Sequence, residues 1–233
     1  MGLRRKENPR SVYVVLSVGD TVYVVGGRGI DGGNEIETVE TIDVSTGAVG
    51  LGTALPTGLA HHGCATSSGQ LIVAGGYVDG DPSSAVWVFD PSFGWSAGPA
   101  LPAPRARLAC AARGMRMVCV GGVNDAGDTI ASVYEWNRNG DTDWQTKATM
   151  LHPRRDAALV YSRTFYVLGG EFDGSPTSTI DSFTPDGNRW YAVGTLTHAA
   201  AGAAFTSVGS ECILVGGLES GGVRARALKF SAR

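Results

Sequence analysis

The sequence predicts an all-β fold built from five similar modules, and three observations lead to that prediction. An apolar run ends in Gly-Gly five times, with steps of 49, 46, 48 and 47 residues, a period typical of propellers and solenoids. A tight-turn dipeptide precedes each run, as in a β-hairpin, and no stretch combines helical periodicity with capping residues. The pairs are Gly26-Gly27, Gly75-Gly76, Gly121-Gly122, Gly169-Gly170 and Gly216-Gly217.

Each module begins with two strands, which we name A and B, joined by the tight turn. Strand A holds small and apolar residues and is predicted at 11–18, 63–67, 108–113, 157–161 and 202–208. The turns are Gly19-Asp20, Ser68-Gly69, Gly114-Met115, Ser162-Arg163 and Gly209-Ser210. Strand B is predicted at 22–25, 71–74, 117–120, 165–168 and 212–215. Its continuous apolar runs indicate a sheet buried on both faces, as between stacked blades.

Strands C and D complete the module. Strand C ends in a large apolar residue, namely Ile42, Phe89, Trp136, Phe183 and Phe230. Strand D opens with Trp95, Trp144 or Trp190, whereas the first module has Val49 in that place. The fifth module stops after strand C, so we expect the last blade to be incomplete or completed by the N-terminal segment. Residues 1–8 form a basic segment, and like charges opposite the last strand would disfavour that pairing.

The order of apolar run, Gly-Gly, C-strand aromatic, Trp, Leu-Pro and Pro-Arg closely resembles kelch repeats. Examples are Leu55-Pro56, Leu101-Pro102, Pro9-Arg10 and Pro153-Arg154. The resemblance covers residues 9–233 and implies one kelch-type β-propeller domain of five four-stranded antiparallel blades. Kelch propellers typically have six or seven blades. The chain is therefore expected either to close as a five-bladed ring or to form part of a larger propeller.

The net charge and the distribution of apolar residues limit the kinds of partner that the chain is expected to bind. The chain has 233 residues and a formal net charge of −3, which provides no general basic field for nucleic acid. No apolar stretch approaches the ~20 residues of a membrane-spanning helix. We therefore expect neither a nucleic-acid nor a membrane partner. The lack of a glycosylation acceptor motif and of a clear signal peptide favours a cytoplasmic location.

Motifs of enzymes, metals and cofactors are weak or missing. Gly27-x-Gly29-x-x-Gly32 copies a dinucleotide fingerprint, but a strand-like segment follows it where that site needs a helix. No zinc-type cysteine spacing and no GxSxG occur, so we expect no enzymatic activity, metal or cofactor. Cys110 and Cys119 lie opposite each other if Gly114-Met115 is a turn, and they could cross-link there. Reduced thiols are the expectation for a cytosolic protein.

The candidate binding residues lie in the connections between strands. In a propeller, the D–A and B–C connections gather at one end of the central channel. The resemblance implies that arginines there contact acidic partner segments, so we expect a protein or peptide partner with an acidic segment. The predicted partner-binding residues are Arg10, Arg105, Arg107, Arg154, Arg155, His62, His198, Tyr77 and Phe172.

Three alternatives remain open beside this prediction. The Pro-Arg arginines could instead hold neighbouring blades together. The same arginines and histidines could serve a carbohydrate-active kelch enzyme, such as a sugar-acid mutarotase or epimerase, by holding a carboxylate and moving a proton. The chain could also be a partial propeller without retained function. The sequence leaves the oligomeric state open.

Overall fold

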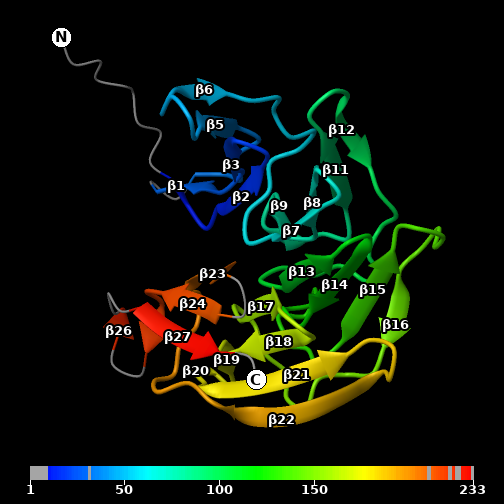
Figure 1. Cartoon of the computed structure of the whole chain (residues 1–233), viewed down its shortest axis with the longest axis vertical. Coiled ribbons are helices and arrows are strands. Elements are labelled where there is room, and N and C mark those ends of the chain that lie inside the picture. The colour runs from blue at the N-terminus through cyan, green and yellow to red at the C-terminus, as the bar shows by residue number, and fades with distance from the viewer. Residues whose placement is uncertain (1–9, 31–32, 209–210, 220–221, 224–226, 232–233) are drawn as a thin grey trace.

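The computed structural model of the chain describes residues 10–30, 33–208, 211–219, 222–223 and 227–231 (Figure 1). These residues form strands, turns and loops without a helix, which confirms the all-β prediction. Blade 1 consists of β2 (Val14–Val18), β3 (Thr21–Val25), β5 (Val39–Asp43) and β6 (Val49–Leu51). Blade 2 consists of β7 (Gly63–Ser67), β8 (Gln70–Ala74), β11 (Val86–Asp90) and β12 (Gly94–Ala97).

The later blades repeat this antiparallel order. Blade 3 consists of β13 (Ala109–Arg113), β14 (Arg116–Val120), β15 (Val133–Asn137) and β16 (Gln145–Lys147). Blade 4 consists of β17 (Ala158–Tyr161), β18 (Phe165–Leu168), β21 (Thr179–Thr184) and β22 (Arg189–Thr195). Blade 5 has three strands, β23 (Ala204–Val208), β24 (Glu211–Val215) and β27 (Ala227–Ser231). The predicted closing strand in residues 1–8 lies outside the described residues.

Small two-stranded ribbons follow three of the five glycine pairs, where the sequence predicted plain loops. They pair β9 (Tyr77–Val78) with β10 (Asp81–Pro82), β19 (Glu171–Phe172) with β20 (Ser175–Pro176), and β25 (Leu218–Glu219) with β26 (Gly222–Val223). After Gly26-Gly27, β4 (Arg28–Gly29) pairs instead with β1 (Arg10–Ser11), in the segment that leads into blade 1. In blade 3 the same place holds the turn at 124–127, flanked by the bridge between Val123 and Thr129. The ribbons stiffen the segment between strands B and C.

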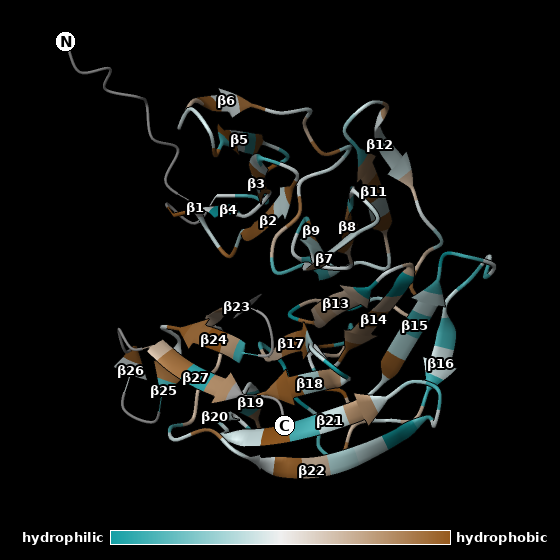
Figure 2. Cartoon of the chain, viewed as in Figure 1, coloured by the Kyte–Doolittle hydropathy of each residue, from teal (hydrophilic) through white to brown (hydrophobic). Residues whose placement is uncertain are grey.

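The blades are arranged around a central axis. Their inner strands β2, β7, β13, β17 and β23 contact one another in that order, and the later strands of each blade lie farther out. Figure 2 shows brown, apolar colouring on inner strands such as β17, β18 and β24, whereas the outer strand β16 is largely teal. The apolar strands predicted from the sequence therefore form the centre of the molecule.

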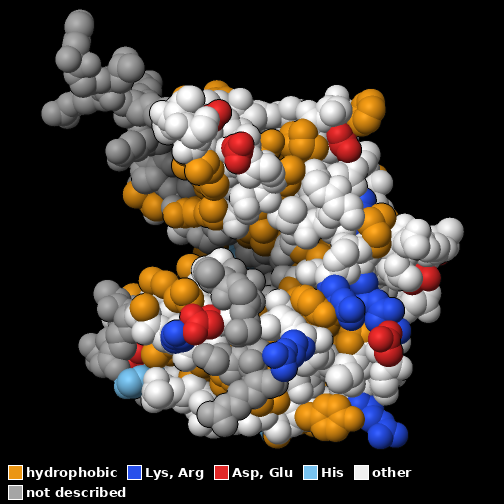
Figure 3. Space-filling view, viewed as in Figure 1, with side chains coloured by type: hydrophobic (Ala, Val, Ile, Leu, Met, Phe, Trp, Pro, Cys, Tyr) orange, Lys and Arg blue, Asp and Glu red, His pale blue; other side chains and the backbone are white. Residues whose placement is uncertain are grey.

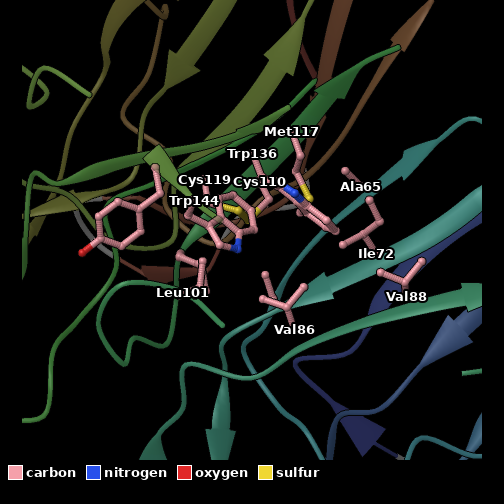
Figure 4. Close-up of a cluster of buried hydrophobic side chains, with 13 residues drawn as sticks. Ala65, Ile72, Val86, Val88, Leu101, Cys110, Met117, Cys119, Trp136 and Trp144 are labelled. Atoms are coloured by element: carbon pink, nitrogen blue, oxygen red, sulfur yellow. A yellow bond between two sulfur atoms is a disulfide. The ribbon is translucent and has the colours of Figure 1, made fainter. Parts of the chain in front are cut away.

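Four hydrophobic clusters form the core, one in each interface between consecutive blades. The cluster between blades 2 and 3 contains Ile72, Met117, Trp136 and Trp144 (Figure 4). A disulfide joins Cys110 and Cys119 in this cluster, so the expectation of reduced thiols is wrong for this pair. The predicted turn at Gly114-Met115 places the two cysteines directly opposite each other on β13 and β14.

The glycine pairs bring neighbouring blades close together. Gly26 has φ 62°, and a Cβ built on it would lie 2.5 Å from the carbonyl oxygen of Leu59. The N–H of Gly27 donates to that same oxygen at 2.7 Å. A side chain at Gly26 would therefore push the blades apart, which is why this position requires glycine.

In the part of the chain that the structure describes, one side of the ring is open. Figure 3 shows a hollow between the upper half, blades 1 and 2, and the lower half, with hydrophobic side chains on both of its edges. Cross-strand pairing places six apolar residues on the side of blade 1 that faces away from blade 2, which we name the free face: Val15, Val22, Val24, Ile42, Val49 and Leu51. Val15 is 54% exposed and Leu51 74% exposed. Across the hollow, Val215 of blade 5 is also exposed. Among the described residues, none is part of a helix that could cross a membrane.

Candidate functional site

The B–C and D–A connections lie together at one end of the antiparallel blades, and we name this end the loop face. Five residues in equivalent positions line its centre, and each has a left-handed backbone. Their φ angles are 53° at Val12, 53° at His61, 58° at Arg107, 51° at Asp156 and 63° at Gly202. Non-glycine residues rarely adopt this conformation, and strained residues of this kind cluster at functional sites.

Hydrogen bonds between blades hold these left-handed residues in place. The N–H of His61 donates to the Val12 oxygen at 3.2 Å, and that of Arg107 to the His61 oxygen at 2.8 Å. Likewise, the N–H of Asp156 donates to the Arg107 oxygen at 3.0 Å, and that of Gly202 to the Asp156 oxygen at 2.8 Å. Each bond crosses from one blade to the next. The backbone therefore places one residue per blade at the lining of a common cavity.

These residues surround a cavity of about 270 Å³, which we name the mouth pocket. It is lined by the left-handed residues and by those that follow them, including His62 and Leu108. A second cavity of about 310 Å³ lies along the inner strands, lined by residues such as Cys64, Ala111 and Leu159. The lining of the mouth pocket includes the charged residues Arg107 and Asp156, whereas the second cavity is lined by uncharged residues.

His62 is the least satisfied group in the mouth pocket. It is 4% exposed, and neither ring nitrogen has a hydrogen-bond partner. Burial lowers the pKa of His62 to about 4, with a smaller effect from His61 beside it. Burial also lowers the pKa of His61, although Asp156 opposes that shift. The His62 ring packs in the interface of blades 1 and 2 beside Gly26, in the slot that the core residue Leu108 fills beside Gly75 in the next interface.

Arg107 and Arg155 lie at the loop face, as predicted, but both are already paired. The guanidinium of Arg107 forms an ion pair with Asp156 and lies 3.6 Å from a Glu171 oxygen. Arg155 pairs with the other oxygen of Glu171. Both arginine side chains are about a quarter exposed, at 26% and 24%. They are therefore accessible but electrically neutralised.

Arg105 and Arg154 differ from the prediction, because both are buried and contact no solvent. Arg105 is 0% exposed, donates to Ser132 Oγ at 2.9 Å and lies 3.9 Å from the centre of the Tyr134 ring. Arg154 donates to the carbonyl oxygens of Gly169 and Thr179 and forms an ion pair with Asp181. Both arginines hold the D–A connection against the blade that it enters. This geometry corresponds to the alternative in which the Pro-Arg arginines hold blades together.

The remaining predicted residues are divided between the centre and the margin of the loop face. Tyr77 packs edge-on against His61, with ring centroids 5.7 Å apart. Phe172 is 42% exposed and packs against His152 at 5.7 Å, beside a small cavity of about 120 Å³. His198 is exposed and contacts Thr197, apart from the mouth pocket. For Arg10 the structure describes only the backbone, which pairs with Gly29.

The charge of the loop face also differs from the basic patch that the sequence predicted. Arg28 is paired with Glu35, so each of the three exposed arginines described there has a carboxylate partner. Exposed aspartates remain on the B–C connections of blades 2, 3 and 4. They are Asp79, Asp81, Asp125, Asp128 and Asp173, and no described lysine or arginine pairs with them. The described part of the loop face is therefore acidic.

Sequence reasoning missed the two carboxylates that form ion pairs with Arg107 and Arg155. Asp156 occupies the same repeat position as His61 and Arg107, so aligning the modules on that position would have found it. The contacts of Glu171 with two arginines depend on how blades 3 and 4 meet, which the repeat pattern does not show. In the described part of the chain no three His, Cys, Asp or Glu residues lie close enough to hold a metal ion.

The fold and the loop face define a β-propeller, and comparison with known proteins places it in a family. Residues 12–217 match the family model of the KLHDC2/KLHL20/DRC7 Kelch-repeats domain. The chain therefore belongs to the kelch-repeat family, which confirms the resemblance inferred from the sequence.

Relatives and a solved structure agree with this assignment. The chain is 27% identical over 202 residues to Kelch-like protein 25 of Xenopus tropicalis, covering 80% of this chain and 33% of the relative. It is 27% identical over 133 residues to human Kelch repeat and BTB domain-containing protein 13, covering 55% of this chain and 29% of the relative. It thus spans about a third or less of these curated relatives. The structure of YjhT shares the fold, with a TM-score of 0.82, 19% identity, and coverage of 96% of this chain and 80% of that one.

Proposed function

We propose that this kelch propeller binds a protein or peptide through its loop face, with the mouth pocket at the centre of the contact. The single observation that carries the proposal is the mouth pocket itself, which lies at the centre of the loop face and is lined by one left-handed position from each of the five blades. Concave pockets with a few converging polar groups, here His61, Arg107 and Asp156, are the usual places for a ligand to bind.

The surroundings of the pocket support a polypeptide ligand. Tyr77 and Phe172 project from ribbons on two blades and offer aromatic surface, which is enriched at protein interfaces. The pocket volume of about 270 Å³ suits one inserted side chain better than a whole cofactor. Names of relatives such as Kelch-like protein 25 are consistent with a repeat domain used within a larger protein.

The acidic segment expected from the sequence is the less favoured partner within this proposal. Such a segment would have to displace Asp156 and Glu171 from Arg107 and Arg155, and it would approach exposed aspartates. Arg107 and Arg155 would then contribute by exchanging one carboxylate partner for another.

A random-peptide display selection on the whole chain tests the proposal. We expect selected peptides to lose most of their affinity for Phe172→Ala and Tyr77→Ala, because truncating an aromatic hot spot costs about 2 kcal/mol or more. Phe93→Ala is the matched control, since Phe93 is 90% exposed and lies in a C–D turn at the opposite end of the blades. Peptides that bind all three variants as they bind the original chain would overturn the proposal.

A sugar-acid enzyme is the second candidate, favoured by Arg107 and His61 in one pocket. Arg107 would hold the carboxylate and His61 would move a proton at the anomeric centre. NMR exchange spectroscopy on sugar acids with and without the protein tests this candidate. Anomer exchange rates that equal those in buffer would remove it.

A further inference from the structure

The end of the blades opposite the loop face carries the A–B and C–D turns, and we name it the turn face. Over blades 3 and 4, arginines lie in these turns or at the strand residues that border them: Arg113, Arg116, Arg138, Arg163 and Arg189. The carboxylates of the same turns are fewer, namely Asp141, Asp143 and Asp186. Figure 3 shows blue side chains gathered over β13, β14 and β15. This part of the turn face is therefore basic, although the whole chain has a net charge of −3.

Arg113 and Arg163 are the unpaired arginines of this patch that lie nearest the central channel. Tyr161, the last residue of β17, contacts both of them. The Arg113 guanidinium lies 5.3 Å from the centre of the Tyr161 ring, and the Tyr161 hydroxyl donates to the Arg163 carbonyl oxygen at 3.3 Å. Both arginines are exposed, and within the described part of the chain neither forms an ion pair with a carboxylate. Two unpaired arginines from neighbouring blades therefore border one tyrosine.

The second cavity, of about 310 Å³, reaches the turn face at the same tyrosine. Its lining comes from the half of each inner strand that leads to the A–B turn, and it includes Ala112 and Tyr161. Ala112 directly precedes Arg113, and Tyr161 lies two residues before Arg163. Phe205, in the wall of the cavity, is 39% exposed. The unpaired arginines therefore lie at the rim of a concave surface with aromatic walls, which is the usual form of a binding site.

A carboxylate of the chain itself already occupies the outer part of the patch. Asp186, in the C–D turn of blade 4, forms an ion pair of 2.6 Å with Arg116 of blade 3, although the Asp186 side chain is 80% exposed. The hydrogen bond from Arg116 is the main cause that lowers the pKa of Asp186, and the charges of Arg113 and Lys147 lower it further. The patch therefore favours the ionised form of a carboxylate placed on it.

We propose that the turn face of blades 3 and 4 binds an acidic protein segment, one carboxylate of which pairs with Arg113 and Arg163 at the rim of the second cavity. Arginine holds a carboxylate through two parallel hydrogen bonds, and the planar group of Arg113 is already held against a ring. Nucleic acid fits less well, because its many phosphates would meet a few arginines on a protein of net charge −3. The site is separate from the mouth pocket and does not rest on the function proposed above.

Three fluorescein-labelled probes test the proposal by fluorescence anisotropy on the whole chain. They are a Gly-Ser peptide with interspersed glutamates, the same peptide with glutamines, and a single-stranded oligonucleotide with the charge of the glutamate peptide. We expect the glutamate peptide to bind and the glutamine peptide not to bind. The affinity of the glutamate peptide should fall at least about fivefold between ~0.05 M and ~0.3 M salt, because exposed charges are screened.

Variants separate the patch from the overall charge of the protein. Arg113→Gln/Arg163→Gln should weaken the glutamate peptide by about tenfold, because it removes both unpaired charges at the rim. Arg28→Gln/Lys229→Gln changes the net charge equally, on the loop face and on blade 5, and should leave the affinity within about twofold. Arg113→Lys/Arg163→Lys keeps the charge without the planar groups and should give an intermediate affinity. Tyr77→Ala should change nothing, which distinguishes this site from the loop face.

Four outcomes would overturn the proposal. The first is the absence of glutamate-peptide binding, and the second is equal weakening by the two double glutamine variants, which would assign the binding to overall charge. The third is an oligonucleotide that binds more tightly than the glutamate peptide and loses affinity in Arg113→Gln/Arg163→Gln, as on a nucleic-acid surface. The fourth comes from light scattering: an oligomer that this variant converts to a monomer would show that a second copy of the chain covers the patch.

Discussion

The two faces of blade 1 carry similar side chains but meet different surroundings. The face toward blade 2 places Tyr23, Val25 and Val39 against Leu71 and Val73 in one of the four core clusters. The free face carries Val22, Val24 and Ile42, and it faces the open side of the ring. In blade 2 the residues equivalent to Val22 and Val24 are Leu71 and Val73, which are both fully buried.

The difference shows which features hold neighbouring blades together. The three interfaces between blades 1 and 4 combine an apolar cluster, a glycine pair and an indole donor. Trp95, Trp144 and Trp190 donate to the carbonyl oxygens of Thr53, Pro99 and Ala148 in the connection before each blade. Blade 1 has Val49 at the position of these tryptophans and lacks this donor. The free face of blade 1 is thus still apolar, although no other blade packs against it among the described residues.

The largest expected effect contrasts two equivalent valines. Val73→Asp places a carboxylate in the buried interface and should cost about 5 kcal/mol or more in the free energy of unfolding. Val24→Asp places it on the free face, where water remains available, and should cost about 1 kcal/mol. Urea unfolding followed by tryptophan fluorescence measures both. Equal costs would mean that the free face is covered in solution.

The second prediction concerns the buried arginines that join connection and blade. Arg154→Met removes the partner of Asp181 and leaves a buried carboxylate, which should cost about 3–5 kcal/mol. Arg105→Met should cost less, about 1–2 kcal/mol, because Arg105 is hydrogen-bonded to neutral groups and stacked on Tyr134. Urea unfolding of both variants measures the two costs, and equal costs would show that the unpaired carboxylate is not the cause of the difference.

The third prediction is a pH dependence that originates from His62, which lies between blades 1 and 2. Its pKa is about 4 in the folded protein against an ordinary value of 6.5, so the unfolded chain takes up more protons between these values. Stability should therefore fall as pH drops through this window, by about 2 kcal/mol from pH 7 to pH 5. Burial also lowers the pKa of His61 in the same pocket.

His62→Leu is the control for this dependence. It should flatten the stability profile between pH 7 and pH 5 while leaving the profile below pH 4 similar. Urea midpoints across this range provide the measurement. A variant that keeps the slope would assign it to another group.

The smallest expected effect tests the indole donor. Trp144→Phe keeps an aromatic ring in the cluster of blades 2 and 3 but loses the bond to Pro99, which should cost about 1 kcal/mol. Val49→Trp adds an indole on the free face and should change stability by less than about 0.5 kcal/mol. Thermal unfolding of both variants gives the comparison. A clear gain from Val49→Trp would indicate an acceptor across the open side.

Most of the fold could be predicted from the sequence because each blade is specified locally. The apolar runs, turn dipeptides and glycine pairs located strand B to within one residue at every copy, as at β18 (Phe165–Leu168). The ribbons were missed because segments such as Glu171–Phe172 are two residues long and lack strand periodicity. In the sequence, the open side was indicated only by a missing strand in the fifth module and a missing Trp in the first. Which residues it exposes could be determined only from the spatial arrangement of the blades.

The candidate site was harder to predict, since its properties arise between blades. The position of Arg107 and Arg155 at the loop face followed from the repeat. Their neutralisation did not, because Asp156 and Glu171 reach them from neighbouring connections. Burial of Arg154 depends on Asp181, which lies on the blade that its connection enters. The charge of the loop face therefore could not be predicted from the sequence, because it depends on contacts between residues from different connections.

The central claim is that five blades stand around one axis with one apolar side open, and solvent accessibility of valine methyl groups tests it most directly. Methyl NMR with a soluble paramagnetic probe compares Val15, Val24 and Val49 with their buried counterpart Val73. The account predicts strong relaxation enhancement at Val15 and Val49, intermediate enhancement at Val24 and almost none at Val73. Equal protection of all four would contradict the open side and the arrangement of blades described above.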